Sequence, residues 1–309
     1  MNVIKRKPVL LLVLLLSITF SGCLLKLPAE PSWPDEPNGP TAEVTLSSGV
    51  WKTTIENEVI YQGGRLGKAI TAAIENLGPG IINIRSSGEL NDRISPQAGQ
   101  TLDFHNNTIG GNQSIHVVHQ DNVTIRNLHM NGNPLHSLAF HGSSYIHLHN
   151  IWLQFSGNSG GIRIDNDRYE NEVYTKGVKV TGKMLIEGTS GHGFETYGID
   201  GIGIDAIVTR NTAGCGVLLN ESKNVYICLV DAYRADPQGG YAGFRVANFN
   251  GPNVVVDKVI AKECGRGFFS VSGSHGTTIN YIEVSGTYNE GIFIQNSKQG
   301  EKHGEKMAR

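Results

Sequence analysis

Apolar and polar residues alternate in short stretches along most of the chain, and these stretches return at a nearly constant interval. Each stretch opens with glycine and an apolar residue, and the opening glycines are Gly193, Gly216, Gly243, Gly267 and Gly291, at intervals of 23, 27, 24 and 24 residues. Gly161, Ser137 and Ser114 extend the register toward the N-terminus. Period-two strands broken by glycine, asparagine and aspartate at this interval predict a solenoid with several short strands per coil.

Other repeat architectures fit this pattern less well. A leucine-rich repeat needs Leu and Asn at fixed places, and a propeller blade needs nearly twice the period. The pattern therefore predicts an all-β, right-handed parallel β-helix. Before it, Leu66, Ile70, Ala73 and Ile74 lie on one face of a helix that Gly78 ends, and this short helix is expected to cap the N-terminal end of the solenoid.

The first 50 residues have the composition of a targeting signal followed by a proline-rich linker. Three basic residues precede an apolar run over residues 8–20, and Ser21-Gly22-Cys23 resembles a bacterial lipobox in which the cysteine carries lipid. Five prolines between residues 28 and 40 suggest a semi-extended tether. We expect a lipoprotein signal peptide over residues 1–23, a tether over 24–50, a β-helix domain over 51–297 and a polar tail over 298–309. A plain secretory signal is the alternative.

These features predict an exported bacterial lipoprotein, at the outer membrane or cell surface and held to the membrane through a lipid on Cys23. The net charge of -2, with only 17% charged residues and no basic cluster, argues against a nucleic-acid partner, and a monomer is expected. Without Cys23 the cysteines are Cys215, Cys228 and Cys264, which allow at most one disulfide and leave open whether it forms.

On the solenoid interpretation, residues 55–297 resemble the pectin-lyase-like right-handed parallel β-helix superfamily. Gly191-His192-Gly193 is similar to the Gly-His-Gly of polygalacturonases, although the other motifs of that hydrolase family are missing. Tyr197-Gly198-Ile199-Asp200 is similar to the start of the Tyr-Gly-Phe-Asp-Pro-His-Asp motif of alginate C5-epimerases, but Gly201 and Ile202 replace Pro and His. No specific family follows. The resemblance implies an exported carbohydrate-active enzyme that acts on acidic polysaccharides.

Stacking the coils on the glycine register assigns side chains to the inside and the outside. Phe194, Val217, Phe244 and Phe268 then form one interior ladder, and polar residues meet on one outer face of the middle coils. The expected catalytic residues are His192, Glu195, Tyr197 and Arg163. The expected substrate-binding residues are Asp165, His141, Asn220, Arg245 and Arg266. The competing interpretation is an exposed cross-strand ion pair between Arg163 and Glu195.

These residue types favour a pectate-lyase-like β-elimination on a uronate-containing polysaccharide. Forked arginine donors neutralise sugar carboxylates, His192 or Tyr197 exchanges protons, and Glu195 orients a partner. C5-epimerisation and polygalacturonase-like hydrolysis, in which Asp165, Glu195 and Asp200 supply acid and base, are alternatives, and so is a non-catalytic glycan-binding β-helix. Asp165 and Glu195 are also candidates for a calcium site, because calcium prefers hard oxygen ligands, although two carboxylates are few for such a site.

Overall fold

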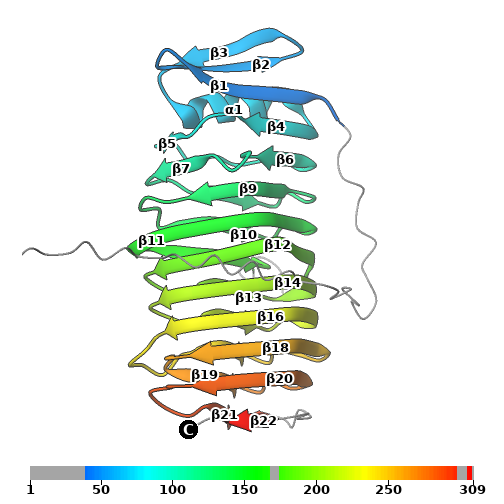
Figure 1. Ribbon diagram of the computed structural model, residues 1–309. Coiled ribbons are helices and arrows are strands. Elements are labelled where there is room, and N and C mark those ends of the chain that lie inside the picture. Colours follow the sequence, from blue (N-terminus) through cyan, green and yellow to red (C-terminus); the bar gives the residue numbers. More distant parts are fainter. Residues whose placement is uncertain (1–38, 168–173, 298–304, 308–309) are drawn as a thin grey trace, which may run out of the picture.

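The chain folds into a right-handed parallel β-solenoid, as the repeat predicts. A computed structural model describes residues 39–167, 174–297 and 305–307. Strands account for 62% of the structure, the described residues contain one helix, and the solenoid makes about nine turns. Figure 1 shows the coils stacked along one axis, from the blue N-terminal strands to the red C-terminal strands.

Three antiparallel strands and one helix close the N-terminal end of the solenoid. β1 (Thr41–Ser47), β2 (Val50–Ile55) and β3 (Glu58–Gly63) form a meander, and α1 (Leu66–Leu77) packs against it (Figure 1). The helix buries Leu66, Ile70, Ala73 and Ile74, the four residues expected on its apolar face. β1 also pairs in parallel with β4 (Gly80–Ile84), so backbone hydrogen bonds join the cap to the first coil.

The folded domain begins earlier than the sequence indicated. β1 lies within residues 24–50, the range assigned to the tether, so the boundary at residue 51 is wrong. Ala42 and Val44 are fully buried, and Ser48-Gly49 forms a two-residue turn with positive φ angles at both positions. The alternation of residues 42–46 is a strand signal, but it follows directly on the prolines and was hidden by them.

Each coil of the solenoid contributes to two parallel sheets. The narrow sheet contains β8 (Ile115–Val118), β10 (His136–His141), the C-terminal part of β11 (Ile146–Asp165), β13 (Phe194–Tyr197), β15 (Val217–Asn220), β17 (Ala242–Ala247), β19 (Arg266–Val271) and β21 (Ile292–Gln295). The wide sheet contains β4, β5 (Gly88–Leu90), β6 (Gln100–Asp103), β7 (Thr108–Gly111), β9 (Thr124–Met130), the N-terminal part of β11, β12 (Thr175–Thr189), β14 (Ile199–Thr212), β16 (Lys223–Ala235), β18 (Val254–Lys262), β20 (Thr277–Ser285) and β22 (Glu305–Met307).

Long strands of the wide sheet contain register shifts, and β11 has two in its pairing with β12. In β11 and β12 the register shifts at Asn150 and Gly182, both of which have positive φ angles. The wide sheet therefore folds around the core, and the narrow sheet closes the remaining side of each coil.

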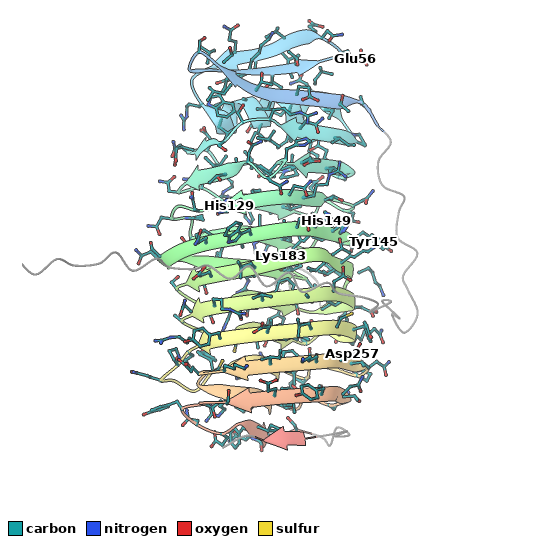
Figure 2. All side chains as sticks on the ribbon, in the orientation of Figure 1. Glu56, His129, Tyr145, His149, Lys183 and Asp257 are labelled. Carbon is teal, nitrogen blue, oxygen red and sulfur yellow. The ribbon has the colours of Figure 1, made fainter. Side chains whose placement is uncertain are left out.

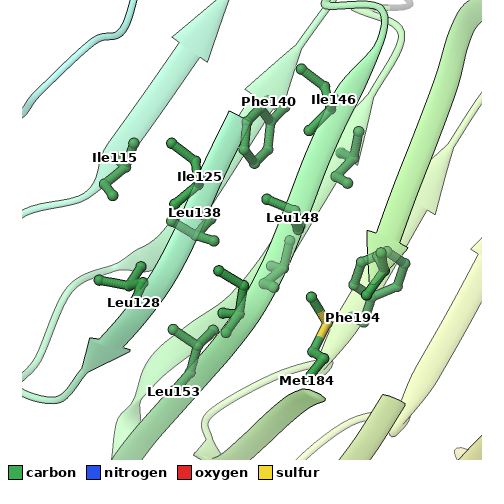
Figure 3. Close-up of a cluster of buried hydrophobic side chains, with 14 of the residues drawn as sticks. Ile115, Ile125, Leu128, Leu138, Phe140, Ile146, Leu148, Leu153, Met184 and Phe194 are labelled. Atoms are coloured by element: carbon green, nitrogen blue, oxygen red, sulfur yellow. The ribbon is translucent and has the colours of Figure 1, made fainter. Parts of the chain in front are cut away.

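Inward side chains form continuous ladders between the two sheets. Phe194, Val217, Phe244 and Phe268 occupy successive rungs of the narrow sheet, with exposed fractions of 0, 0, 0 and 6%, which confirms the predicted interior ladder. Figure 3 shows Phe194 in the same interior as Met184 of the wide sheet. The interior of the solenoid is thus lined by apolar side chains along its axis.

Close packing between coils explains why the repeat opens with glycine. A Cβ added at Gly193 would lie 2.7 Å from the carbonyl oxygen of Gly216, and one at Gly216 would lie 2.7 Å from that of Gly243. Any side chain at these positions would push neighbouring coils apart. Glycine at these two positions therefore permits the close stacking of neighbouring coils in the narrow sheet.

Several sequence-based assignments fall at the ends of the chain. The signal peptide, Cys23 and the prolines before residue 39 lie outside the described residues, so the lipoprotein assignment stays a prediction. Within the polar tail, the segment Glu305–Met307 pairs with β20 as a strand. No helix of the described residues is long and apolar enough to cross a membrane.

Cys215 and Cys264 are buried free thiols, so neither is bridged to Cys228.

Candidate functional site

The narrow sheet brings together the polar residues that the register predicted on one face. Arg163 of β11 lies beside Glu195 of β13, and Asp165 lies beside Tyr197 in the same strand pair. On the other side of β11, His141 of β10 pairs with Asp165. These five side chains occupy three adjacent rungs, so strand spacing alone places them within contact distance.

Arg163 bridges two carboxylates. Its Nε donates to Oδ2 of Asp165 at 2.9 Å, and its Nη1 lies 3.5 Å from Oε2 of Glu195. Asp165 is only 5% exposed, and its other oxygen, Oδ1, lies 2.8 Å from Nδ1 of His141. The cluster is therefore a continuous network across three strands and not the isolated exposed ion pair of the competing interpretation.

The two carboxylates of the cluster differ in proton affinity. Burial alone would raise the pKa of Asp165, but hydrogen bonds from His141 and Arg163 outweigh it and hold this pKa at about 2. Burial raises the pKa of Glu195 above its ordinary value, although Arg163 opposes the shift. At neutral pH Asp165 is ionised, whereas Glu195 retains its proton more readily than an exposed glutamate. Such a separation is typical of acid and base pairs.

The ionised Asp165 determines which nitrogen of the His141 ring carries the shared hydrogen. A carboxylate only accepts hydrogen bonds, so the hydrogen shared with His141 lies on Nδ1 and the lone pair of the ring lies on Nε2. The His141 side chain is 29% exposed, which leaves its ring accessible. This arrangement makes His141 a base with a carboxylate behind it.

A cavity of about 510 Å³ opens over this cluster on the narrow face. It is lined by Arg93, Asn112, Gln113, Ser114, His116, Leu135, His136, Ala139, His141, Arg163, Asp165 and Asp167. Three predicted residues, His141, Arg163 and Asp165, thus line a cavity, and the volume suits one or two sugar units of a polymer.

Sequence reasoning missed Arg93, His116 and His136. Burial lowers the pKa of both histidines, so their rings are neutral at neutral pH, and the ring of His116 meets that of His141 edge-on at 4.8 Å. Both histidines point outward in the predicted register. On the coil next to each of them the register has a small residue, Ala139 beside His116 and Gly160 beside His136, so neither was grouped with the charged residues. Arg93 precedes the glycine register, and only its neighbour Ile94 pairs with Ile115.

Predicted residues on the next coils do not line the cavity. Asn220 is 3% exposed and donates from Nδ2 to Oε1 of Glu195 at 3.2 Å, so it positions Glu195. Tyr197 lies beside Asp165 on the sheet but outside the cavity lining. Nδ1 of His192 accepts a hydrogen bond from the backbone N–H of Cys215 at 2.9 Å, and its ring meets Tyr241 edge-on. The structure thus gives Asn220 and His192 positioning contacts in place of the substrate-facing positions expected for them.

His192 makes folding stability sensitive to acid. Burial, with help from Arg245 and Arg163, lowers its pKa from 6.5 to about 4. The unfolded chain therefore binds more protons between pH 4 and 6.5, and the free energy of unfolding falls as pH drops through that window. His192→Gln retains an acceptor for Cys215 but does not titrate. We expect it to reduce the loss of stability between pH 7 and pH 4 by about 1 to 3 kcal/mol, measured by urea unfolding. Equal losses in both proteins would contradict a neutral buried His192.

Arg245 and Arg266 lie at the C-terminal end of the narrow sheet, away from the cavity. Arg266 Nε lies 2.7 Å from Oε2 of Glu290, and its Nη1 donates to the carbonyl oxygen of Gly240. Arg245 is stacked against Phe269 with its guanidinium carbon 4.8 Å from the ring centre. The column Arg163, Glu195, Leu218, Arg245 places Arg245 three rungs from Arg163.

The proposed calcium ligands already share a cation. Arg163 contacts both Asp165 and Glu195, and its positive charge disfavours a second cation between them. Within residues 39–167, 174–297 and 305–307, no group of three or more His, Cys, Asp or Glu side chains has the arrangement of a metal site.

Polar and aromatic side chains of the wide sheet bond to one another. Figure 2 shows His129 and His149 on this sheet. His129 stacks on Trp152 with ring centres 4.3 Å apart, and Nδ1 of His149 lies 2.8 Å from Oγ1 of Thr181. His149 also belongs to a chain of hydrogen bonds across neighbouring strands, through Asn150 to Asn127 and Asp103. The narrow face is taken as the candidate site because a cavity opens beside its charged cluster.

No protein family model, no curated protein and no solved structure matches this chain.

Proposed function

We propose that the protein is a carbohydrate-active enzyme of the pectin-lyase-like class that cleaves a uronate-containing polysaccharide by β-elimination. The observation that carries this proposal is the His141, Asp165 and Arg163 network at the wall of the cavity. In this network His141 is a base whose tautomer is fixed by Asp165, and Arg163 is a cation beside it. An elongated solenoid face also suits a polymer, which extends beyond the cavity at both ends.

In this proposal His141 is the base. Nε2 removes the proton at C5 of the uronate, the electron pair forms the double bond between C4 and C5, and the bond from C4 to the leaving oxygen breaks. Asp165 stabilises the imidazolium that forms on His141. Arg163 and Arg93 bind the sugar carboxylate and make the C5 proton acidic, because both line the cavity.

Glu195, which contacts the cavity residue Arg163 but does not itself line the cavity, is the proposed source of the proton for the leaving oxygen. Burial raises its pKa, so it holds a proton closer to neutral pH than an exposed glutamate does. The same protonated state leaves the positive charge of Arg163 less neutralised, which favours an acidic substrate. These residues therefore supply all three roles that elimination requires.

Hydrolysis is the second candidate, favoured by the difference in proton affinity between Asp165 and Glu195. A hydrolytic base must bind water, but both oxygens of Asp165 are engaged, by His141 and Arg163. Elimination and C5-epimerisation, which begin with the same proton removal by His141, avoid this difficulty.

The test is incubation of the purified protein with uronate and neutral polysaccharides, with and without calcium. We expect new reducing ends on a uronate polymer together with the ultraviolet absorbance of unsaturated uronate ends. Reducing ends without absorbance would show hydrolysis instead, and inversion at C5 without cleavage would show epimerisation. Binding without turnover on every polymer would overturn the enzymatic proposal in favour of a glycan-binding protein.

A further inference from the structure

Two described arginines differ from the others because neither forms an ion pair. Arginine nitrogens lie within 4.0 Å of a carboxylate oxygen at Arg65, Arg85, Arg126, Arg163, Arg210, Arg234 and Arg266. Among the residues that the structure describes, Arg93 and Arg245 are the exceptions. Arg93 lines the cavity already described. Arg245 is a second uncompensated cation on the narrow face.

Arg245 is held between two aromatic rings. Its guanidinium carbon lies 4.8 Å from the ring centre of Phe269 and 5.3 Å from that of Tyr241. Phe269 is 7% exposed, and its ring also lies 4.8 Å from the guanidinium carbon of Arg266, whereas Tyr241 is 40% exposed. Stacking fixes the plane of the guanidinium and leaves its edge for a planar anion.

The loop that carries Tyr241 is fixed in place. The backbone N–H of Tyr241 donates to Oδ2 of Asp236 at 2.8 Å. Arg266 donates to the carbonyl oxygen of Gly240, and Asn289 Nδ2 donates to that of Gly239 at 2.7 Å. Tyr241 is therefore positioned over Arg245 before any ligand binds, which reduces the entropy that binding must overcome.

Among the described residues no carboxylate forms an ion pair with Arg245, although Asp236 and Glu195 act electrostatically on its neighbours His192 and Cys215. Burial raises the pKa of the neighbouring Cys215 thiol to about 12, so this thiol is neutral. His192, on the same side, is neutral because its pKa is lowered to about 4. Nε of Arg245 is buried without a hydrogen-bond acceptor. A cation in such surroundings is stabilised by an anionic ligand.

We propose that Arg245, between Tyr241 and Phe269, is a carboxylate subsite for a distant unit of the same polymer. This inference rests on the proposed function. Arg245 is three rungs from Arg163, a distance of about 14 Å at the usual strand spacing. One rung is close to the length of one sugar unit, so a chain lying along the solenoid axis presents a carboxylate to Arg163 and another to Arg245. Leu218 lies between them as an apolar surface for a sugar ring.

The experiment measures calorimetric binding of galacturonate, mannuronate and glucuronate oligomers, as disaccharides and as octasaccharides. We expect Arg245→Gln to weaken binding of the octasaccharide about tenfold, because one charge-assisted contact is lost. Binding of the disaccharide is expected to stay unchanged, since it cannot reach Arg245 from Arg163. Tyr241→Ala, which removes one of the two rings beside Arg245 and also the edge-on contact with His192, is expected to show the same dependence on length. Arg210→Gln, on the wide sheet, is the matched control and is expected to change neither affinity.

The outcomes separate this proposal from the proposed function. If wild-type protein neither binds nor cleaves any of the oligomers, both proposals are wrong. If wild type binds and Arg245→Gln leaves octasaccharide affinity unchanged, the subsite alone is wrong. Equal weakening of both oligomers, together with a lowered melting temperature, would assign Arg245 a structural role and would also overturn the subsite.

Discussion

His141→Gln is expected to lower kcat for cleavage of a uronate polymer by about 10² to 10⁴, the usual contribution of a general base, with little change in KM. The amide has nearly the same length as the imidazole and keeps a donor toward Oδ1 of Asp165, which accepts from His141 in the wild-type protein. It has no basic nitrogen at the position of Nε2. Binding of the polymer is therefore retained while proton removal is lost.

The measurement is the initial rate of ultraviolet absorbance at several polymer concentrations. His149→Gln is the matched control, because His149 is also a partly exposed histidine bonded to a neighbouring side chain, but it lies on the wide sheet (Figure 2). It is expected to retain wild-type kcat. If His141→Gln retained full activity, the base would have to be sought among His116 and His136, which line the same cavity.

The fold could be predicted because its strongest constraint is visible in the sequence. Several glycines of the register are required by the close approach of successive coils, and the alternation that follows each of them assigns the next few residues to the inside or the outside. Arg163 beside Glu195 and Asp165 beside Tyr197 follow from that register alone. The N-terminal meander was not predicted, because its strands pair antiparallel outside the repeat.

The site could be predicted only where the register decides it. The register places His192 beside Cys215, 23 residues later on the next coil, but it does not say whether the ring turns toward that backbone or toward a ligand. Nor does the register predict the loop that places Tyr241 over Arg245. Arg93 lies on an irregular coil before the first glycine of the register, so its place in the cavity depends on the fold as a whole.

Phe194→Ala is expected to lower the free energy of unfolding by about 3 to 5 kcal/mol, as large-to-small changes in a closed core do. Phe194 has no exposed surface, and it lies between Ile162 and Val217 in the interior ladder (Figure 3). Coils above and below are fixed by backbone pairing on both sheets, so the cavity left by the ring cannot collapse.

Equilibrium urea unfolding measures this loss, with Phe249→Ala as the matched control. Phe249 is 70% exposed, so its truncation removes a ring from solvent and is expected to change stability by less than about 0.5 kcal/mol. A loss below about 1 kcal/mol for Phe194→Ala would contradict the interior ladder. Because a solenoid coil contacts mainly its neighbours, a broadened or two-step transition in Phe194→Ala would locate the damage in the coils around β13, next to the cluster of Arg163 and Glu195.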